Sequence, residues 1–321
     1  MSNINTTDIQ FRYLTDGTLI DVANSPQLGN NINGPSLIKV PDWIANPLGR
    51  YYLYFAHHEG RYIRLAYADE LTGPWHIHSP GTLQLSQSLF CQSAPKEEDM
   101  LPEVLSMIAE GIDGDYPHIA SPDVHVEEQT QRIKMYFHGR LDNGTQKTRV
   151  AYSTNGLDFK VEPELLGDSY FRVFGLEGNY YAIALGSTLY RSADGVTDFV
   201  SGPRLTDQNY RHGAIFQYRN EVFVIWSRAG DCPECLLVSK IPINKPWLDW
   251  KLQDTVELHR PAKAWEGADE PAELSRYGGV MTRVHQLRDP GVFRSDGKNY
   301  LLYSVAGEQG IAIGELLVSN T

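Results

Sequence analysis

Asp289 and Asp123 each lie directly beside a proline and open an apolar run. Asp289 precedes Pro290 in RDPGVF, and Asp123 follows Pro122 in SPDVHV. Because proline fixes φ and donates no ladder hydrogen bond, it suits a strand entrance at which a neighbouring side chain is aimed. Two carboxyl groups that face one pocket from separate strands are the equipment of glycoside hydrolysis. The plainer interpretation of each of these two dipeptides is a carboxylate that caps a turn.

Histidine and arginine side chains form a second group of candidates, most of them at the ends of apolar strands. Histidine can serve as acid, base or metal ligand near neutral pH, so we expect His212 to join Asp289 and Asp123 in catalysis. Seven side chains are expected to bind substrate: Asn33, His58, His138, Arg140, Arg228, Arg288 and Glu270. His118 belongs to the same polar rim. A lone histidine is more often structural, and this is the interpretation for His57, His125 and His259.

Five similar hairpin units position these side chains. Each unit is a short apolar strand, a turn, a strand rich in Tyr and Phe, and a third strand, and such runs bounded by turn residues predict antiparallel sheet. Repetition at about 40 to 50 residues is typical of propeller blades. We therefore predict an all-β, five-bladed β-propeller with one domain over residues 1–321. The predicted blades cover approximately residues 30–80, 115–160, 168–203, 209–255 and 285–318. An N-terminal strand at 8–14 is expected to join the last blade.

The first strand of each blade lines the channel of a propeller. Aligning the five strand starts predicts one level that is occupied by Gly34, Ser121, Tyr170, His212 and Asp289. Asp289 and Asp123 are thereby expected to face one central pocket.

Two further stretches could carry chemistry. DCPEC, residues 231–235, is a CxxC motif, but a structural zinc site needs four ligands and the chain has no second cysteine pair. A surface loop in the fourth blade is the favoured interpretation, with Glu234 as a minor acid candidate. The loop 264–279, AWEGADEPAELSRYGG, carries Glu266, Asp269, Glu270 and Glu273. It leads into the Asp289 strand, and we expect it to form a pocket wall.

Composition excludes several classes of partner. The formal net charge is −12, from 40 acidic and 28 basic residues, whereas a nucleic-acid ligand requires a basic face. No apolar stretch approaches the length of a transmembrane helix, so no membrane partner is expected. The N-terminus MSNINTTDIQF lacks the pattern of a signal peptide, and the three cysteines are expected to be reduced, which predicts a cytoplasmic protein. No cofactor is indicated by these features.

Several segments resemble the five-bladed propeller glycoside hydrolases, especially family 43 and its relatives in families 32, 62 and 117. The resemblance lies in SPDVHVEEQTQRIKMYFHG, in GPSLIKV with GRYYLYFAHH, in YADELTGPW, and in RDPGVF with NYLLYSVAG. It implies a carbohydrate substrate and, as in some relatives, a structural calcium or other divalent metal in the channel. The chain departs from the family 43 catalytic trio, with Gly34, Tyr170 and His212 where the family has acidic residues. Family 117 uses a histidine as acid, which fits His212.

The leading hypothesis is therefore a glycoside hydrolase that acts on a short oligosaccharide in a central pocket. Asp289 would be the general base, Asp123 would orient the sugar or tune a neighbouring pKa, and His212 or an acid from the loop 264–279 would protonate the leaving oxygen. Two alternatives stay open: a non-catalytic carbohydrate-binding propeller, and a lyase-like enzyme using His and Arg around a uronate. The lyase predicts a Tyr, His or Arg cluster without a carboxyl pair.

Overall fold

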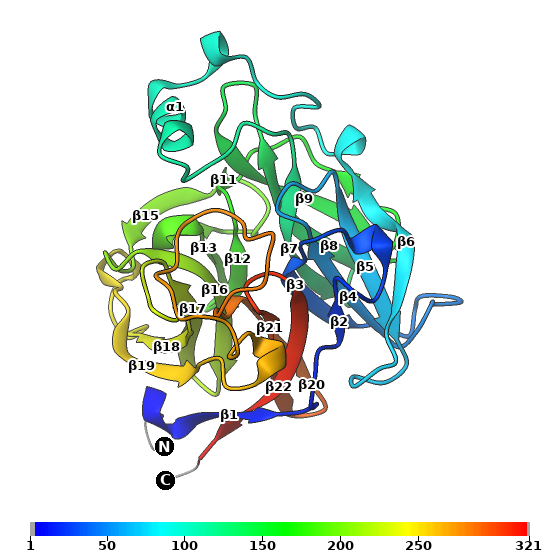
Figure 1. The fold of residues 1–321 in the computed structure, drawn as a ribbon, viewed down its shortest axis with the longest axis vertical. Coiled ribbons are helices and arrows are strands. Elements are labelled where there is room, and N and C mark those ends of the chain that lie inside the picture. Colours follow the sequence, from blue (N-terminus) through cyan, green and yellow to red (C-terminus); the bar gives the residue numbers. More distant parts are fainter. Residues whose placement is uncertain (1–3, 320–321) are drawn as a thin grey trace.

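Five antiparallel sheets are arranged as the blades of a propeller in the computed structural model, which describes residues 4–319 (Figure 1). The five-bladed β-propeller predicted from the sequence is thereby confirmed. The first blade has four strands: β3 (Asn33–Lys39), β4 (Tyr51–Ala56), β5 (Tyr62–Ala68) and β6 (His76–Gln84). The second blade has five: β7 (Ile119–Glu127), β8 (Arg132–Arg140), β9 (Gln146–Ser153), β10 (Lys160–Val161) and β11 (Gly167–Asp168).

The other three blades follow the same order along the chain. The third blade has four strands: β12 (Arg172–Leu176), β13 (Asn179–Ile183), β14 (Thr188–Ser192) and β15 (Val200–Arg204). The fourth blade also has four: β16 (Tyr210–Tyr218), β17 (Glu221–Arg228), β18 (Leu236–Ile241) and β19 (Gln253–His259). The fifth blade has three strands from the C-terminal part of the chain: β20 (Arg288–Ser295), β21 (Lys298–Val305) and β22 (Gly310–Val318).

The N-terminal segment completes the fifth blade. Strand β1 (Ile9–Tyr13) pairs antiparallel with β22, from Ile9 opposite Val318 to Tyr13 opposite Gly314, and the short β2 (Ile20–Asp21) pairs with the same strand. Strands β1 and β22 consequently lie side by side near the bottom of Figure 1. A blade built from both ends closes the ring and leaves its inner sheet edges covered.

Aromatic and aliphatic side chains fill the interfaces between blades. In β8, Ile133, Met135 and Phe137 pack in a cluster with side chains of the first blade. Tyr136, on the opposite face of the same strand, packs with Phe171 of the third blade region. Successive side chains of a strand point to opposite faces, so a strand packed on both faces is apolar along its whole length. Similar clusters join the remaining neighbouring blades, including the fifth and the first.

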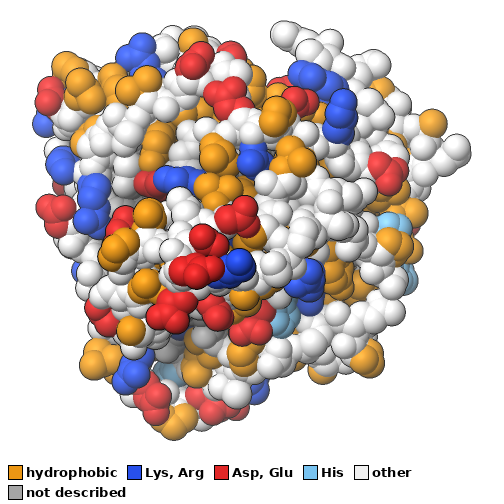
Figure 2. Space-filling model, turned by 90° about the horizontal axis from the view of Figure 1, so that it is seen from above, with side chains coloured by type: hydrophobic (Ala, Val, Ile, Leu, Met, Phe, Trp, Pro, Cys, Tyr) orange, Lys and Arg blue, Asp and Glu red, His pale blue; other side chains and the backbone are white. Residues whose placement is uncertain are grey.

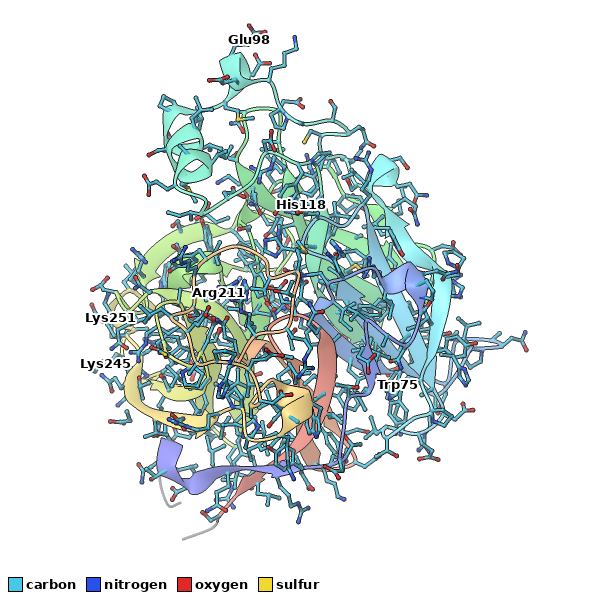
Figure 3. The ribbon with its side chains drawn as sticks, in the orientation of Figure 1. Trp75, Glu98, His118, Arg211, Lys245 and Lys251 are labelled. Carbon is cyan, nitrogen blue, oxygen red and sulfur yellow. The ribbon has the colours of Figure 1, made fainter. Side chains whose placement is uncertain are left out.

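A long insertion between the first two blades carries α1 (Pro102–Ala109) and lies at the top of Figure 1. The amide of Leu101 donates to the carbonyl of Asn143, 3.1 Å away, and a Cβ at Gly144 would lie 2.9 Å from Val104. The helix is thus anchored on the β8–β9 hairpin. Glu98 lies at the outer end of the insertion in Figure 3. Figure 2 views the molecule from that side and shows acidic side chains gathered near the middle of the picture.

Helices are short throughout residues 4–319. Besides α1 there are seven single-turn 3₁₀ segments: Thr6–Asp8, Pro26–Leu28, Leu85–Gln87, Glu97–Asp99, Leu185–Ser187, Trp247–Asp249 and Ala264–Glu266. None of these described helices has the length and apolar character needed to cross a membrane.

Candidate active site

The inner strand of each blade begins with a backbone irregularity, which in every blade but the first places a side chain at the central cavity. In the first, second, fourth and fifth blades the ladder register shifts at this point, so two residues of the inner strand oppose one residue of the next strand. Ser121, Tyr170 and Asp289 have φ angles of 54°, 68° and 45°, which non-glycine residues seldom adopt. Such strain is held only where surrounding contacts enforce it, often at functional sites.

These irregularities surround a central cavity of about 540 Å³. Its inner part is lined by side chains from the starts of the inner strands and from the ends of the second strands: Asn33, His58, His118, Ser121, His138, Tyr170, Arg211, His212 and Asp289. His118 and Arg211 lie between the blades in Figure 3, whereas Lys245 and Lys251 lie at the periphery. A volume of this size accommodates a small-molecule ligand.

A cluster of Asp289, His212 and Tyr170 forms the floor of the cavity. Oδ1 of Asp289 lies 2.5 Å from Nδ1 of His212, without the alignment of an ordinary hydrogen bond, and accepts a hydrogen bond of 2.8 Å from the Tyr170 hydroxyl. The rings of Tyr170 and His212 are stacked, with centroids 4.3 Å apart. Oδ2 of Asp289 is buried and has no hydrogen-bond partner within residues 4–319. Since buried carboxylate oxygens are normally satisfied, Oδ2 is poised to bind a water or ligand group.

Burial and neighbouring charges set the protonation of this cluster. Burial raises the pKa of Asp289, but His212 and Arg211 together more than offset that effect and the pKa lies below its ordinary value. Burial lowers the pKa of His212 in spite of the adjacent carboxylate, and burial together with Asp289 raises the pKa of Tyr170 well above its usual range. At neutral pH the floor therefore holds an ionised Asp289 beside a neutral imidazole and a neutral phenol.

Two more histidines line the cavity next to this floor. The rings of His118 and His138 meet edge to face, with centroids 5.5 Å apart. Burial lowers the pKa of His118 to about 4 and that of His138 well below its ordinary value. Nδ1 of His138 is buried without a hydrogen-bond partner in the described chain. It is a second polar atom that a ligand could satisfy.

Glu308 supports the floor from the turn between β21 and β22, and the sequence analysis missed it. Its carboxylate accepts hydrogen bonds from Asn31 (2.5 Å), Asn33 (3.0 Å) and Arg288 (2.9 Å). Burial would raise the pKa of Glu308, but His58 and the two nearby guanidinium groups hold it well below its ordinary value. The sequence held a signal for Glu308. The segment SVAGEQG ends the second strand of the fifth blade, just as FAHHEG, which contains the candidate His58, ends the second strand of the first blade.

Arg211, which lines the cavity, and Arg288 behind it lie between Glu308 and Glu234. Oε2 of Glu234 is 3.4 Å from Nε of Arg288 and 3.7 Å from Nη1 of Arg211, and all four side chains are almost fully buried. Arg211 also donates to the carbonyls of Arg276 and Gly278. The end of the loop 264–279 is thus tied to the cavity by a buried cation, and its Tyr277 and Gly278 line the wall.

The structure places Asp123 outside the cavity. Asp123 pairs with Tyr136 in the regular part of the β7–β8 ladder, after the irregularity at Ser121 and Pro122. Its Oδ2 accepts hydrogen bonds from His125 (3.0 Å) and from the amide of Val173 (2.8 Å). Residues on the two sides of the proline therefore differ: Asp289 precedes its proline and faces the cavity, whereas Asp123 follows its proline and joins the second blade to the third.

The blade-four alignment was wrong by one residue. Arg211 and His212 are the two extra residues between the pairs Tyr210–Arg228 and Gly213–Trp226. In the fifth blade the corresponding extra residues are Asp289 and Pro290. Arg211 consequently occupies the level of Asp289, and His212 occupies the level of the prolines. The error arose because no proline marks the irregularity in the fourth blade.

The remaining predicted site residues divide into two groups. Asn33, His58 and His138 line the cavity, whereas Arg140, Arg228, Arg288 and Glu270 do not. The guanidinium of Arg140 is wholly buried against Asp113 and two carbonyls, and Arg288 is buried against Glu308. Arg228 pairs with Asp231 on the outside of the fourth blade, and Glu270 pairs with Arg283. Because the charged groups of these four side chains are already paired, they are not available to bind a substrate.

The loop 264–279 forms part of the wall, but its acidic residues point elsewhere. Glu266 is buried in a separate cluster, where it accepts hydrogen bonds from Tyr13, Tyr303 and His259. Asp269 pairs with Arg283 as Glu270 does. His259, like His125 beside Asp123 and His57 beside Asn30, makes a local hydrogen bond through its ring.

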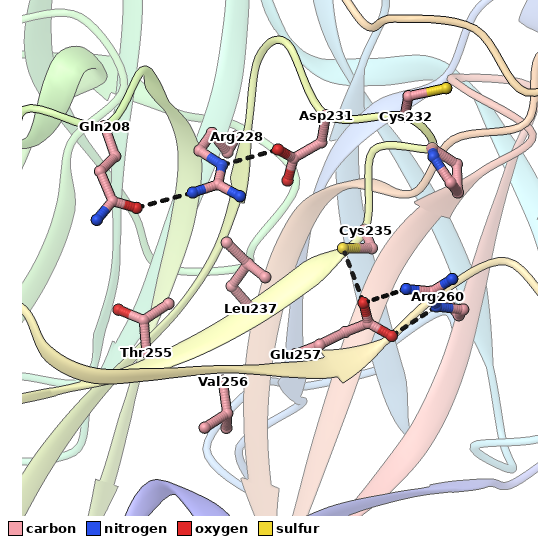
Figure 4. Close-up of a pocket in the computed structure, with 11 residues that line it drawn as sticks. Gln208, Arg228, Asp231, Cys232, Cys235, Leu237, Thr255, Val256, Glu257 and Arg260 are labelled. Carbon is pink, nitrogen blue, oxygen red and sulfur yellow. Dashed lines mark hydrogen bonds and ion pairs between the residues drawn. The ribbon is translucent and has the colours of Figure 1, made fainter.

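The CxxC motif lies in a different depression, on the fourth blade (Figure 4). Cys232 is exposed, Cys235 is buried, and both are free thiols. Sγ of Cys235 lies 3.7 Å from Glu257, which is also bound by Arg260. Burial, with Glu257 nearby, raises the pKa of Cys235 to about 12. A thiol in this state is a poor nucleophile and a poor metal ligand.

No group of three or more His, Cys, Asp or Glu side chains within residues 4–319 is arranged to hold a metal ion. The histidines of the cavity contact one another and Tyr170 by their rings, and Asp289 is already engaged with His212 and Tyr170. The donor set does not fit the calcium that the family resemblance implied.

The sequence matches one uncharacterised viral protein over most of its length. Protein R118 of Acanthamoeba polyphaga mimivirus is 33% identical over 308 residues, which cover 88% of this chain and 82% of R118. No family profile matches the sequence.

Several solved structures with the same fold are glycoside hydrolases. The family 43 β-xylosidase/α-arabinofuranosidase CoXyl43, from a compost microbial metagenome and in complex with xylotriose, has a TM-score of 0.58 at 13% identity, covering 95% of this chain and 94% of its own. A family 43 enzyme of Xanthomonas citri with xylotriose gives 0.57 at 12% identity, covering 93% and 88%. The family 32 β-fructofuranosidase of Bombyx mori gives 0.52 at 14% identity, covering 98% and 62%. At these identities the similarity establishes the shared propeller fold.

Proposed function

This chain belongs to the same protein family as R118 of Acanthamoeba polyphaga mimivirus, and we propose that it is a glycosidase that hydrolyses a short, uncharged saccharide in the central cavity. The observation that carries the proposal is the buried Asp289 carboxylate, with one oxygen held by His212 and Tyr170 and the other free. Two of the structures that share the fold hold xylotriose, which supports a sugar in this cavity.

Asp289 acts as the general base in this proposal. Its free Oδ2 accepts a proton from a water molecule as the water oxygen bonds to the anomeric carbon. The glycosidic C–O bond breaks with its electron pair on the leaving oxygen, which then takes a proton from solvent. His212 and Tyr170 are positioning residues, since they fix the orientation of the carboxylate through Oδ1. The lowered pKa of His212 makes it a poor proton donor at neutral pH, so the acid role predicted for it is not retained.

The arrangement of buried charge bears on the lyase alternative. The cavity has the cluster of Tyr, His and Arg side chains, without an Asp289–Asp123 pair, that a lyase predicts. Three buried carboxylates, Asp289, Glu234 and Glu308, lie beside two buried guanidiniums, Arg211 and Arg288, and a third guanidinium, that of Arg172, lies over the Tyr170 ring. With neutral histidines these six side chains carry no net formal charge. We favour hydrolysis because Asp289 lines the cavity with one carboxylate oxygen unpartnered among the described residues, which stabilises the positive charge of an oxocarbenium-like transition state and repels a uronate carboxylate.

A non-catalytic carbohydrate-binding protein is the second candidate. The observation that favours it is the position of Asp123, which is used to join two blades and supplies no second carboxyl group to the cavity. Binding alone needs only the unsatisfied polar atoms of the floor, Oδ2 of Asp289 and Nδ1 of His138.

Turnover of a panel of uncharged aryl glycosides, glycosyl fluorides and xylo-oligosaccharides distinguishes the two candidates. We expect hydrolysis by the wild type and a loss of about 10³-fold or more in Asp289→Asn, because the general base is removed. Asp296→Asn is the matched control, since Asp296 lies on the exposed β20–β21 turn of the same blade. Binding of a sugar without turnover would support the binding protein, and equal turnover in wild type and Asp289→Asn would refute the role of Asp289.

A further inference from the structure

The outer part of the cavity differs in chemistry from its floor. Val104 and Met107 of α1 and Ile112 after the helix line one side, and Leu185 of the third blade region also contributes. Met107 is 39% exposed, although a thioether side chain gains by being covered. An apolar surface that remains open inside a pocket indicates a ligand group that covers it.

Four charged or amide side chains of this outer part are already engaged. Asp113 accepts hydrogen bonds from Arg140 and Gln146, and Lys147 pairs with Asp168 at 2.7 Å. Glu103, Ser169 and Tyr277 also line the cavity, with Glu103 at the exposed start of α1. A second sugar ring needs several free donors and acceptors around its hydroxyl groups, and the paired groups cannot supply them. Free polar atoms occur instead on the floor, at Asp289 and His138. The cavity therefore offers a polar end for one saccharide unit and an apolar end for something else.

We propose that the apolar end binds an aromatic aglycone, so that the substrates are phenolic glycosides; this inference rests on the proposed glycosidase function. A flat ring suits a wall of aliphatic side chains that includes Met107, because thioether sulfur makes favourable contacts with aromatic rings. The departing group also fits. A phenol leaves as a more stable anion than a sugar alcohol does, so it depends less on a proton donor.

The reaction balances without a further reactant. The water oxygen bonds to the anomeric carbon, Asp289 takes the water proton, and the glycosidic bond breaks with its electron pair on the phenolic oxygen. Solvent then protonates the phenolate and Asp289 returns its proton to solvent. Asp113 and Asp168, the two paired carboxylates of the outer cavity, have pKa values below the ordinary range in spite of burial, because Arg140 and Lys147 respectively bind them. Neither is a proton donor at neutral pH.

The test compares phenyl glycosides with glycosyl fluorides of the same sugar, using the full chain. Fluoride has no aglycone and needs no apolar wall, so the ratio of kcat/KM for the two substrates isolates the outer cavity. We expect Met107→Glu to lower this ratio about tenfold, as the loss of one side chain's apolar contact would. Leu248→Glu is the matched control, since Leu248 is 59% exposed on the segment Trp247–Asp249, and its ratio should equal that of the wild type.

Titration calorimetry of phenyl and methyl glycosides separates failure of this inference from failure of the proposed function. Wild-type turnover of the fluoride, with no preference for phenyl over methyl in binding, would overturn the aromatic subsite and leave the glycosidase in place. Absence of all turnover, with tighter phenyl binding that Met107→Glu removes, would overturn hydrolysis and retain the subsite. Absence of both turnover and phenyl preference would overturn both.

Discussion

The phenol ring of Tyr170 lies against the imidazole of His212, with centroids 4.3 Å apart and planes 14° from parallel, while its hydroxyl donates to Asp289. One side chain thereby fixes two others. Tyr170 comes from the third blade, His212 from the fourth and Asp289 from the fifth, so the arrangement also connects three blades at the centre of the propeller. Replacements of these residues should separate positioning from proton transfer.

Tyr170→Phe keeps the stacked ring and removes only the hydrogen bond to Asp289. A hydrogen bond to the ionised form lowers a carboxyl pKa, so its loss should raise the pKa of Asp289 and move the acidic limb of the pH–rate profile to higher pH. We expect kcat to fall about tenfold, in line with the value of one hydrogen bond to a charged group. Tyr67→Phe is the control, since Tyr67 lies on β5 of the first blade and does not line the cavity. An unshifted acidic limb would show that the Tyr170 hydroxyl does not act on Asp289.

Asp123→Asn should affect stability rather than chemistry. The carboxylate of Asp123 holds His125 and the amide of Val173, and the neutral amide side chain weakens both bonds. We expect a loss of about 1–3 kcal/mol in the free energy of unfolding, measured with urea, and turnover close to that of the wild type. Asp289→Asn should instead lose turnover, whatever its effect on stability. Loss of turnover at unchanged stability in Asp123→Asn would place Asp123 in the mechanism.

The fold was predictable because each blade repeats the same pattern on a strand that is buried on both faces. In β8, Ile133, Met135 and Phe137 face one neighbouring blade and Tyr136 faces the other, so the apolar run itself encodes the packing. The aromatic second strands and the turns between them are local features. A sequence pattern reports such features directly.

The site was predictable only in part, because side-chain direction depends on a shift of one residue. Asp289 and Asp123 both lie beside a proline, yet one belongs to the irregular strand entrance and the other to the regular ladder. A slip of one position exchanges the two faces of a strand. Glu308 belongs to the fifth blade and Arg211 to the start of the fourth, and no local pattern places such a buried pair.

Glu308 should make the stability of the protein depend on pH. Its pKa lies well below the ordinary value of 4.5 in the folded chain, so its ionised form stabilises the fold above about pH 4.5, and this contribution is lost as the pH falls below that value. We expect the wild type to lose stability on acidification from pH 5 towards pH 3. Glu308→Gln should be less stable at pH 7 by about 3–5 kcal/mol, because it leaves buried guanidinium charge uncompensated.

Urea unfolding at several pH values measures this difference. The loss of stability between pH 5 and pH 3 should be smaller in Glu308→Gln than in the wild type, because the variant has no carboxyl group to protonate at this position. Glu110→Gln, on the exposed end of the α1 insertion, is the control and should follow the wild type at every pH. Parallel curves for Glu308→Gln and wild type would exclude Glu308 as a source of the pH dependence.

Arg211→Lys should loosen the wall of the cavity while keeping its charge. The guanidinium reaches the carbonyls of Arg276 and Gly278 together, and a lysine ammonium cannot reproduce that planar fork. We expect faster hydrogen exchange at the amides of residues 277–279 and a KM about tenfold higher, since Tyr277 would no longer be held against the substrate. Arg219→Lys, on a surface turn, provides the control. Faster exchange with an unchanged KM would mean that the wall is held by Arg211 but does not contact the substrate.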